Sequence, residues 1–274
     1  MQALPFVFSL LVAGALTPLV LARLAGAGAV RDNYRGRSLP VPLGLVIVPA
    51  ALIALIPVTL LARLTDLDVY PDNLGFAVVF VPGIALLGLI DDALAGAGRG
   101  WRGHGQDLLS GALSTGLLKA GGTLGLALLV ASSLPGSDAD FLLATAVLVL
   151  ATNAFNLLDL RPGRSVKAFV LLGIGLTLST GNTEALAGLG IFIAPVLVAG
   201  WFDLRERAML GDAGSNAIGG LAGLWIVLTL GTEGQVVALL ILVAVNLFGE
   251  FRSISNVIEK VPGLRHLDSL GRPT

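Results

Sequence analysis

The sequence predicts an all-α, polytopic integral membrane protein with about nine transmembrane helices. Its 274 residues are 55% hydrophobic and only 13% charged, and the mean hydropathy is +0.89. A soluble domain uses about a quarter charged residues to cover its surface. Here the apolar residues instead form blocks long enough to cross roughly 30 Å of hydrocarbon. An ordinary soluble globule is therefore excluded.

Each expected span is an apolar run bounded by charged or turn-forming residues. The first run, "LPFVFSLLVAGALTPLVLARL", is too long for a signal-peptide core and lacks a cleavage site, so we expect it to remain as a span. The expected spans lie at 3–22, 43–62, 75–90, 117–134, 141–155, 166–181, 185–201, 215–231 and 235–250.

The charges of successive loops predict the orientation. All 17 Lys and Arg residues except Arg63 lie in one set of loops, Arg99 and Arg102 among them. The other set, "TDLDVYPDN", "PGSDAD", "GNTE" and "GTEGQ", is acidic. Basic loops stay on the cytoplasmic side, and Arg63 can snorkel at a span end. We therefore expect a protein of the cell inner (plasma) membrane with its N-terminus outside and its C-terminus in the cytoplasm.

Two segments of different character are expected. Residues 1–250 form a single transmembrane helical domain, and residues 251–274 form a cytoplasmic amphipathic segment. In that segment apolar residues recur at helical spacing among charged ones: Ile254, Val257, Ile258 and Val261 among Arg252, Glu259 and Lys260. We expect it to lie on the inner membrane surface, with contact to a partner protein as the alternative.

Composition also restricts the chemistry. The chain has no Cys and only two His, His104 and His266, which excludes disulfides, thiolate sites and a histidine-built metal centre. Any metal must be bound by oxygen ligands. A net charge of -1 gives no basic face for nucleic acid, so none is expected as a partner.

Polar residues at span ends mark the candidate site, because they are costly there unless they are used. The first are Asp91 and Asp92 of "GLIDD", adjacent carboxylates at a membrane boundary. Such a pair needs a divalent cation, a basic partner or a shared proton. A solvated helix end is the alternative.

The second group is Asn153, Asn156 and Asp159 of "NAFNLLDLRPGR", spaced three residues apart. On a helix this spacing stacks two amides and a carboxylate along one stripe. The stripe could hydrogen-bond a base or ribose, or fix a metal-bound phosphate. A polar seam between helices is the alternative.

The third group is Gly211, Asp212, Gly214 and Ser215 of "MLGDAGSNAIGG". The glycines let backbone approach a ligand, and Ser215 can cap a helix whose N-terminal amides attract phosphate. Beside such an anion site Asp212 fits a magnesium ligand, because Mg²⁺ takes one or two carboxylates plus substrate phosphates. A simple capped turn is the alternative.

The fourth group is the basic loop "RDNYRGRSLPVPLG", with Arg31, Arg35 and Arg37. These arginines could clamp an anionic head group. The topology rule alone would also explain them.

In order along the chain, "GRSLPVPLG", "GLIDD", "NAFNLLD" and "LGDAGS" resemble the motifs of the polyprenyl-phosphate N-acetylhexosamine-1-phosphate transferases. This superfamily includes phospho-N-acetylmuramoyl-pentapeptide transferase and undecaprenyl-phosphate N-acetylglucosamine-1-phosphate transferase. The resemblance covers nearly the whole chain. It implies transfer of sugar-1-phosphate from a UDP-sugar to a polyprenyl phosphate, with release of UMP, in cell-envelope glycan synthesis.

The resemblance also implies roles for individual residues. Asp212 and Asp91 would bind Mg²⁺, or Mn²⁺ in its place, and Asp91 and Asp92 would bind metal or handle the proton of the lipid phosphate. The remaining roles are a nucleotide pocket lined by Asn153, Asn156 and Asp159, and a phosphate-facing lysine at Lys119. A homodimer is expected on family grounds alone.

The chain departs from the family pattern at two places. Asp159 is followed by "LRPGR" where the family has Gly, which puts Arg161 and Arg164 beside the expected nucleotide site. They could bind a phosphate or form a different sugar pocket. Near the C-terminus His266 stands where the family has a histidine cluster followed by a final span. The donor sugar is therefore left open.

Two alternatives from other classes remain. A catalytically silent homologue could act as a scaffold for envelope assembly, although Asp91, Asp92, Asp159 and Asp212 are all present. A small-solute or lipid transporter would use intramembrane Asp and Asn as a relay, but the polar residues gather at one membrane face and no inverted repeat is seen.

Overall fold

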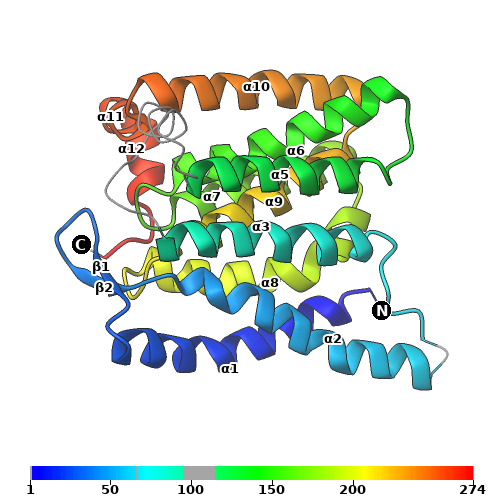
Figure 1. Ribbon diagram of the computed structural model, residues 1–274, viewed down its shortest axis with the longest axis horizontal. Coiled ribbons are helices and arrows are strands. Elements are labelled where there is room, and N and C mark those ends of the chain that lie inside the picture. Colours follow the sequence, from blue (N-terminus) through cyan, green and yellow to red (C-terminus); the bar gives the residue numbers. More distant parts are fainter. Residues whose placement is uncertain (1, 66, 95–114, 274) are drawn as a thin grey trace.

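The computed structural model describes residues 2–65, 67–94 and 115–273; Arg99, Arg102 and His104 lie outside them. Over these residues the fold is a bundle of long, roughly parallel and antiparallel helices (Figure 1). The long helices are α1 (Leu4–Gly26), α2 (Ile47–Leu64), α3 (Leu74–Leu94), α5 (Thr115–Ala131), α6 (Asp138–Leu158), α7 (Arg164–Thr180), α8 (Glu184–Leu204), α9 (Gly211–Thr229) and α10 (Thr232–Phe251).

The remaining elements are short. They are β1 (Val30–Asp32), β2 (Ser38–Pro40), the 3-10 turn η1 (Leu43–Val46), α11 (Ile254–Lys260) and α12 (Pro262–Ser269). The strands β1 and β2 form an antiparallel hairpin in which Arg31 pairs with Leu39. The expectation of an all-helical chain therefore needs this one correction. Strands of three residues are too short to be recognised from an alternating pattern of apolar and polar residues.

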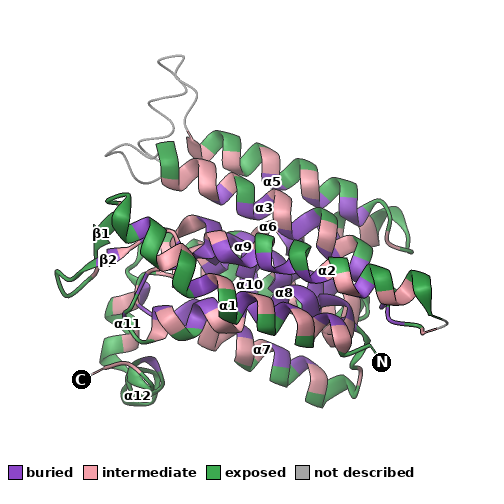
Figure 2. Ribbon diagram, turned by 90° about the horizontal axis from the view of Figure 1, so that it is seen from below, coloured by how far each residue is buried: buried purple, intermediate pink, exposed green. Residues whose placement is uncertain are grey.

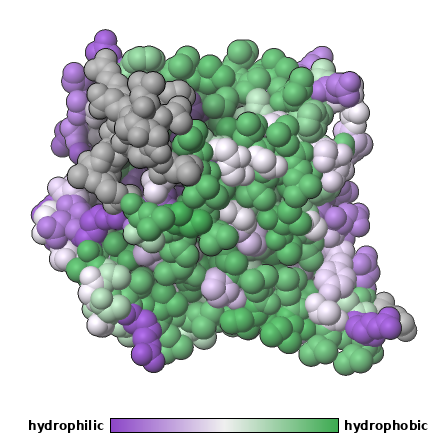
Figure 3. All heavy atoms as spheres, in the orientation of Figure 1, coloured by the Kyte–Doolittle hydropathy of each residue, from purple (hydrophilic) through white to green (hydrophobic). Residues whose placement is uncertain are grey.

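The helices give the chain the character of a multi-pass membrane protein. Each of the nine expected spans coincides with a helix in the described part of the chain, and six helices are long and apolar enough to cross a membrane. Figure 3 shows a broad hydrophobic surface between hydrophilic side chains at the two ends of the long axis. Of the other three helices, α5 and α7 have 17 residues each, and α9 begins with the polar stretch "GDAGSN".

Helix α9 lies at the centre of the bundle, between α3 and α6 (Figure 2). Every residue from Ala213 to Val227 is buried. Small residues permit this position, because a Cβ at Gly219 would lie 2.6 Å from the Cα of Thr152 on α6. A central helix faces other helices rather than lipid, so it does not need the apolar length of a peripheral span.

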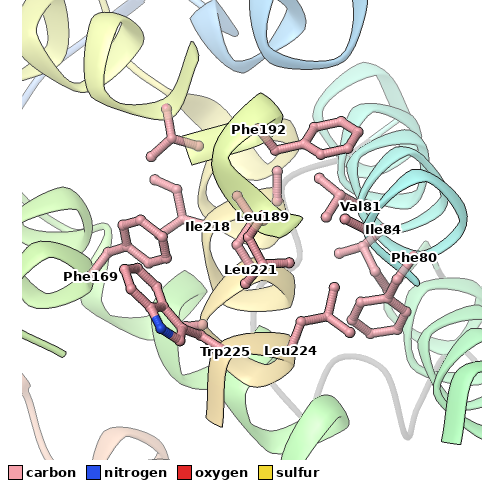
Figure 4. Packing of buried hydrophobic residues seen from close by; sticks show 14 of the residues in the cluster. Phe80, Val81, Ile84, Phe169, Leu189, Phe192, Ile218, Leu221, Leu224 and Trp225 are labelled. Carbon is pink, nitrogen blue, oxygen red and sulfur yellow. The ribbon is translucent and has the colours of Figure 1, made fainter. Parts of the chain in front are cut away.

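Large side chains fill the space around α9 (Figure 4). The rings of Phe169 and Trp225 meet edge to face with centroids 5.5 Å apart. Phe80 and Ile84 of α3 are buried against the opposite side, where Gly220 brings α9 close to the Phe80 ring. The core thus fixes α9 against α3, and with it the polar end of each helix.

Candidate functional site

Two of the sequence motifs, "GLIDD" and "LGDAGS", meet Lys119 at one end of the bundle. Asp91 and Asp92 lie in the last turn of α3, Asp212 lies in the first turn of α9, and Lys119 lies near the start of α5. The Nζ of Lys119 donates to Oδ2 of Asp212 at 2.9 Å and lies 3.4 Å from Oδ2 of Asp91. The side chains of Lys119 and Asp91 are only 16% and 18% exposed, so water screens this pair little, whereas the side chain of Asp212 is 34% exposed.

Asp92 has a different partner. Its Oδ2 accepts a hydrogen bond from the backbone N–H of Ala213 at 3.0 Å, so it caps the N-terminus of α9. Gly211 makes this approach possible: its φ is +71°, and a Cβ there would lie 2.7 Å from Oδ2 of Asp92. The two adjacent carboxylates of "GLIDD" are therefore separated in function. Asp91 faces the lysine, and Asp92 holds α9.

Backbone hydrogen bonds join "PVPLG" to "LGDAGS". The N–H groups of Leu43 and Gly44 donate to the carbonyls of Met209 and Leu210 at 2.8 and 2.9 Å. Gly44 packs so closely that a Cβ there would lie 2.1 Å from the backbone N of Gly214. The loop before η1 is thus fixed to the turn that carries Asp212.

The Asn/Asp stripe of α6 is present, but its members face different helices. Asn156 donates from Nδ2 to Oγ of Ser215 at 3.1 Å, next to Asp212. Asn153 is exposed and donates to Oδ1 of Asn246 on α10 at 2.6 Å. Asp159, at the end of α6, accepts from Oγ of Ser165 on α7 at 3.2 Å. Within the described residues, Asn156 is the member of the stripe whose side chain is hydrogen-bonded to the N-terminal turns of α9.

Glu206 forms ion pairs with two arginines of the basic loop. It has a fully buried side chain, and its oxygens lie 3.4 Å from Arg35 Nε and 3.2 Å from Arg37 Nη1. Nδ2 of Asn33 donates to the same carboxylate at 3.3 Å. These contacts fix the β1–β2 hairpin to the α8–α9 turn, so here the two guanidinium groups have a protein partner.

The arginines of "RPGR" also have protein partners. Arg164 is buried and pairs with Asp268 of α12, with Nε to Oδ1 at 2.9 Å. Arg161 pairs with Glu259 of α11 and lies over the ring of Tyr34, with 5.0 Å from Cζ to the centroid. His266 is exposed on α12. Both arginines therefore anchor the C-terminal segment in this structure.

Asp268 receives two guanidinium groups. Arg272 donates to both of its carboxylate oxygens, at 2.8 and 3.0 Å, and Arg164 donates to both at 2.9 and 3.2 Å. Burial alone would raise the pKa of this carboxyl, but the hydrogen bonds and charges of the two arginines lower its pKa to about 2. Asp268 is thus ionised across the physiological range.

Asp203 is a residue that the sequence motifs do not include. It is only 3% exposed at the end of α8, where Oδ2 accepts from the N–H of Gly163 at 2.6 Å and Oδ1 accepts from the N–H of Leu210 at 3.3 Å. One carboxylate thereby joins the turn after Asp159 to the turn before Asp212. The sequence does contain a signal that could have identified Asp203, because it is an acidic residue at the end of a span on the basic side of the membrane.

The donor set at α3 and α9 suits a hard cation. Among the described residues no three His, Asp or Glu side chains gather closely enough to form a metal centre by themselves. Asp91 and Asp212 nevertheless converge on one ammonium, so the space between them already accommodates positive charge. Mg²⁺ commonly takes one or two carboxylates and completes its shell with water and phosphate. The residues therefore fit such an ion bound together with a phosphorylated ligand.

Comparisons with known proteins add no further assignment. No protein-family model matches the chain, and a comparison with curated proteins gives no match.

Proposed function

We propose that the protein is a Mg²⁺-dependent phosphoglycosyltransferase. It would transfer a sugar-1-phosphate of the N-acetylhexosamine type from a UDP-sugar to a polyprenyl phosphate and release UMP. The observation that carries the proposal is the contact of Lys119 with both Asp91 and Asp212 at the end of the bundle. It brings together residues from three helices, two of which carry motifs that resemble the transferase family.

In this reaction an oxygen of the lipid phosphate attacks the β-phosphorus of the UDP-sugar. A new P–O–P bond forms to the sugar phosphate, the bond from the β-phosphorus to the bridging oxygen breaks, and that oxygen leaves with UMP. Both reactants are anions, so positive groups must offset their repulsion. Lys119 supplies a fixed cation between the carboxylates, and Mg²⁺ held by Asp212 and Asp91 would neutralise further phosphate charge. Mn²⁺ could replace Mg²⁺ there.

The nucleotide would lie toward α6 and the N-terminus of α9. The amides at a helix N-terminus favour an anion, and Asp92 already uses one of them. Asn156 and Ser215, which are hydrogen-bonded to each other, can exchange that contact for ribose or phosphate oxygens. Asn153 and Asp159 flank this position on the same helix.

The location at a bundle end supports a membrane-surface reaction. Basic residues concentrate at this end, which favours a cytoplasmic orientation by the charge rule. A polyprenyl phosphate in that leaflet would keep its chain in the hydrocarbon and present its phosphate at the level of Asp212. The UDP-sugar would arrive from the cytoplasm, so neither substrate needs to cross the membrane.

UMP release by the purified protein tests the proposal. The protein in detergent receives Mg²⁺ and undecaprenyl phosphate, with UDP-GlcNAc, UDP-MurNAc-pentapeptide or another UDP-hexose as separate donors. We expect lipid-dependent UMP from one donor, and its loss with EDTA or in Asp212→Asn. The matched control is Asp138→Asn, which changes an exposed acid at the opposite end of the bundle. Folded protein that releases no UMP from any donor would favour the scaffold alternative.

A further inference from the structure

The C-terminal helices α11 and α12 differ from the rest of the bundle in direction. In both Figure 1 and Figure 2 they lie crosswise to the long helices, beside the end of α10. A helix that crosses a membrane runs with the bundle, whereas one that lies in the interface runs across it. The two short helices therefore have the direction of surface-lying helices.

Polar contacts fix α12 to the bundle. Arg164 and Arg272 hold Asp268, and the Nζ of Lys167 donates to the backbone carbonyls of Leu267 and Asp268 at 3.0 and 2.5 Å. Arg272 also donates to the carbonyl of Pro162 at 2.8 Å. The attached side of α12 is thus built from charges, whereas α11 buries the apolar side chain of Ile254 beside Gly249 at the end of α10.

Other apolar side chains of the two helices are exposed. Leu264 and Leu267 are 43% and 49% exposed, and their spacing of three places them on one side of α12. Val257 and Val261, four residues apart, are 38% and 42% exposed. An apolar row at a membrane end is stabilised when it enters the boundary between head groups and acyl chains.

The exposed charge of the segment is positive. Both of its acids are paired, Glu259 with Arg161 and Asp268 with two arginines. Arg252, Lys260 and Arg265 are exposed, and within the described residues none of them has an ion pair. An apolar row flanked by unpaired cations is complementary to a membrane surface that contains anionic phospholipid.

From these observations we infer that α11 and α12 form a docking surface for anionic phospholipid head groups of the membrane that holds the bundle. The apolar row Val257, Val261, Leu264 and Leu267 enters the acyl boundary, and Arg252, Lys260 and Arg265 bind the head groups. The inference does not depend on the proposed transfer reaction. Because Arg272 also holds Pro162, a lipid-bound segment would in addition support the turn between α6 and α7.

The absence of Cys from the chain permits a direct test. Leu267→Cys carries an environment-sensitive fluorophore on the apolar side of α12, and Ser269→Cys carries it two residues away on the opposite side. Each labelled full-length protein is placed in nanodiscs of phosphatidylcholine alone or mixed with phosphatidylglycerol. We expect brominated lipid to quench the Leu267→Cys label several-fold more than the Ser269→Cys label, with stronger quenching when phosphatidylglycerol is present.

The charge requirement has its own control. Lys260→Gln combined with Arg265→Gln should remove the effect of phosphatidylglycerol on quenching at Leu267→Cys, while the fold of the bundle stays unchanged by circular dichroism. Equal, water-like emission from both labels in both lipids would overturn the proposal. So would a shielded Leu267→Cys label that brominated lipid does not quench, because that result indicates contact with another protein or a second copy.

Discussion

The ammonium of Lys119 lies 2.9 Å from the carboxylate of Asp212, although the two residues are 93 positions apart in the chain. The same ammonium lies 3.4 Å from Asp91, so one cation serves two acids from two helices. Without it, two carboxylates would face each other at a poorly solvated membrane boundary. The relationship therefore both stabilises the bundle end and sets the charge that a phosphate would meet.

Replacement of Lys119 tests its part in the reaction. We expect Lys119→Gln to lower kcat by about 100-fold, the usual effect of removing one charged group that stabilises a transition state. The matched control is Arg63→Gln, which removes an exposed cation in the last turn of α2 and should keep kcat. Initial rates of UMP release give both values. A kcat for Lys119→Gln within twofold of the parent would show that this cation does not act on phosphate.

The contact of Gly44 with Gly214 predicts a steric effect on stability. A Cβ at Gly44 would lie 2.1 Å from backbone N of Gly214, and backbone cannot move aside as a flexible side chain can. We expect Gly44→Ala to lower the free energy of unfolding by about 1–3 kcal/mol. Gly14→Ala is the control, because a Cβ there meets nothing within 4 Å. Thermal unfolding in detergent measures both, and equal Tm values would contradict the observed packing.

Asp203 predicts a coupled effect on stability and activity. In Asp203→Asn one acceptor oxygen becomes an NH₂ group, so the N–H of either Gly163 or Leu210 loses its partner. A buried donor left unpaired costs about 1–3 kcal/mol. We expect a lower Tm and a reduced kcat, since both turns beside the site depend on this carboxylate. Unchanged Tm and kcat would show that the turns are held by other contacts.

The ion pairs of Asp268 predict how docking of α12 depends on pH. The pKa of Asp268 is about 2 in the folded protein and about 3.9 in an unfolded chain. The contribution of the Asp268 ion pairs to the stability of the docked α12 is therefore complete above the unfolded pKa and is lost as the pH falls toward 2. Titration of Asp268 should therefore leave the protection of the peptide bond after Arg265 from trypsin unchanged between about pH 6 and 7, where both values are far below the pH.

Asp268→Asn provides the comparison at one pH. The variant keeps the size of the side chain but leaves Arg164 buried without its counter-ion, which is costly. We expect faster cleavage at Arg265, whereas Asp138→Asn at the opposite end should leave the rate unchanged. Equal cleavage in Asp268→Asn and the parent would show that α12 is held without this pair.

The sequence could predict features that are local or periodic. Long apolar runs predicted the helices and the membrane character, and charges at span ends singled out Asp91, Asp92 and Asp212. The hairpin of residues 30–40 was not predicted, because its two short strands carry no periodic signal. The count of nine spans stays a prediction, since α5, α7 and α9 do not meet the length and hydropathy expected of a span. The cytoplasmic orientation rests on the charge rule alone and stays a prediction as well.

The partners of charged groups could not be predicted, because they depend on which loops meet. Arg35 and Arg37 were expected to clamp an anionic head group, and they contact Glu206, which is 169 positions from Arg37. Arg164 was expected beside a nucleotide, and it pairs with Asp268 across 104 positions. A basic residue shows where positive charge is available, whereas only the fold shows which anion satisfies it. The ligand roles proposed from sequence for these arginines stay predictions.

The destination of the β-phosphorus distinguishes transfer of sugar-1-phosphate from transfer of the sugar alone. The wild-type protein receives undecaprenyl phosphate, Mg²⁺ and the accepted UDP-sugar, labelled with ³²P at the β-phosphorus and with ¹⁴C in the sugar. We expect both labels to enter the lipid fraction in equal amounts, while unlabelled UMP is released. Transfer of ¹⁴C alone, with ³²P left in UDP, would show transfer of the sugar without its phosphate and contradict the account.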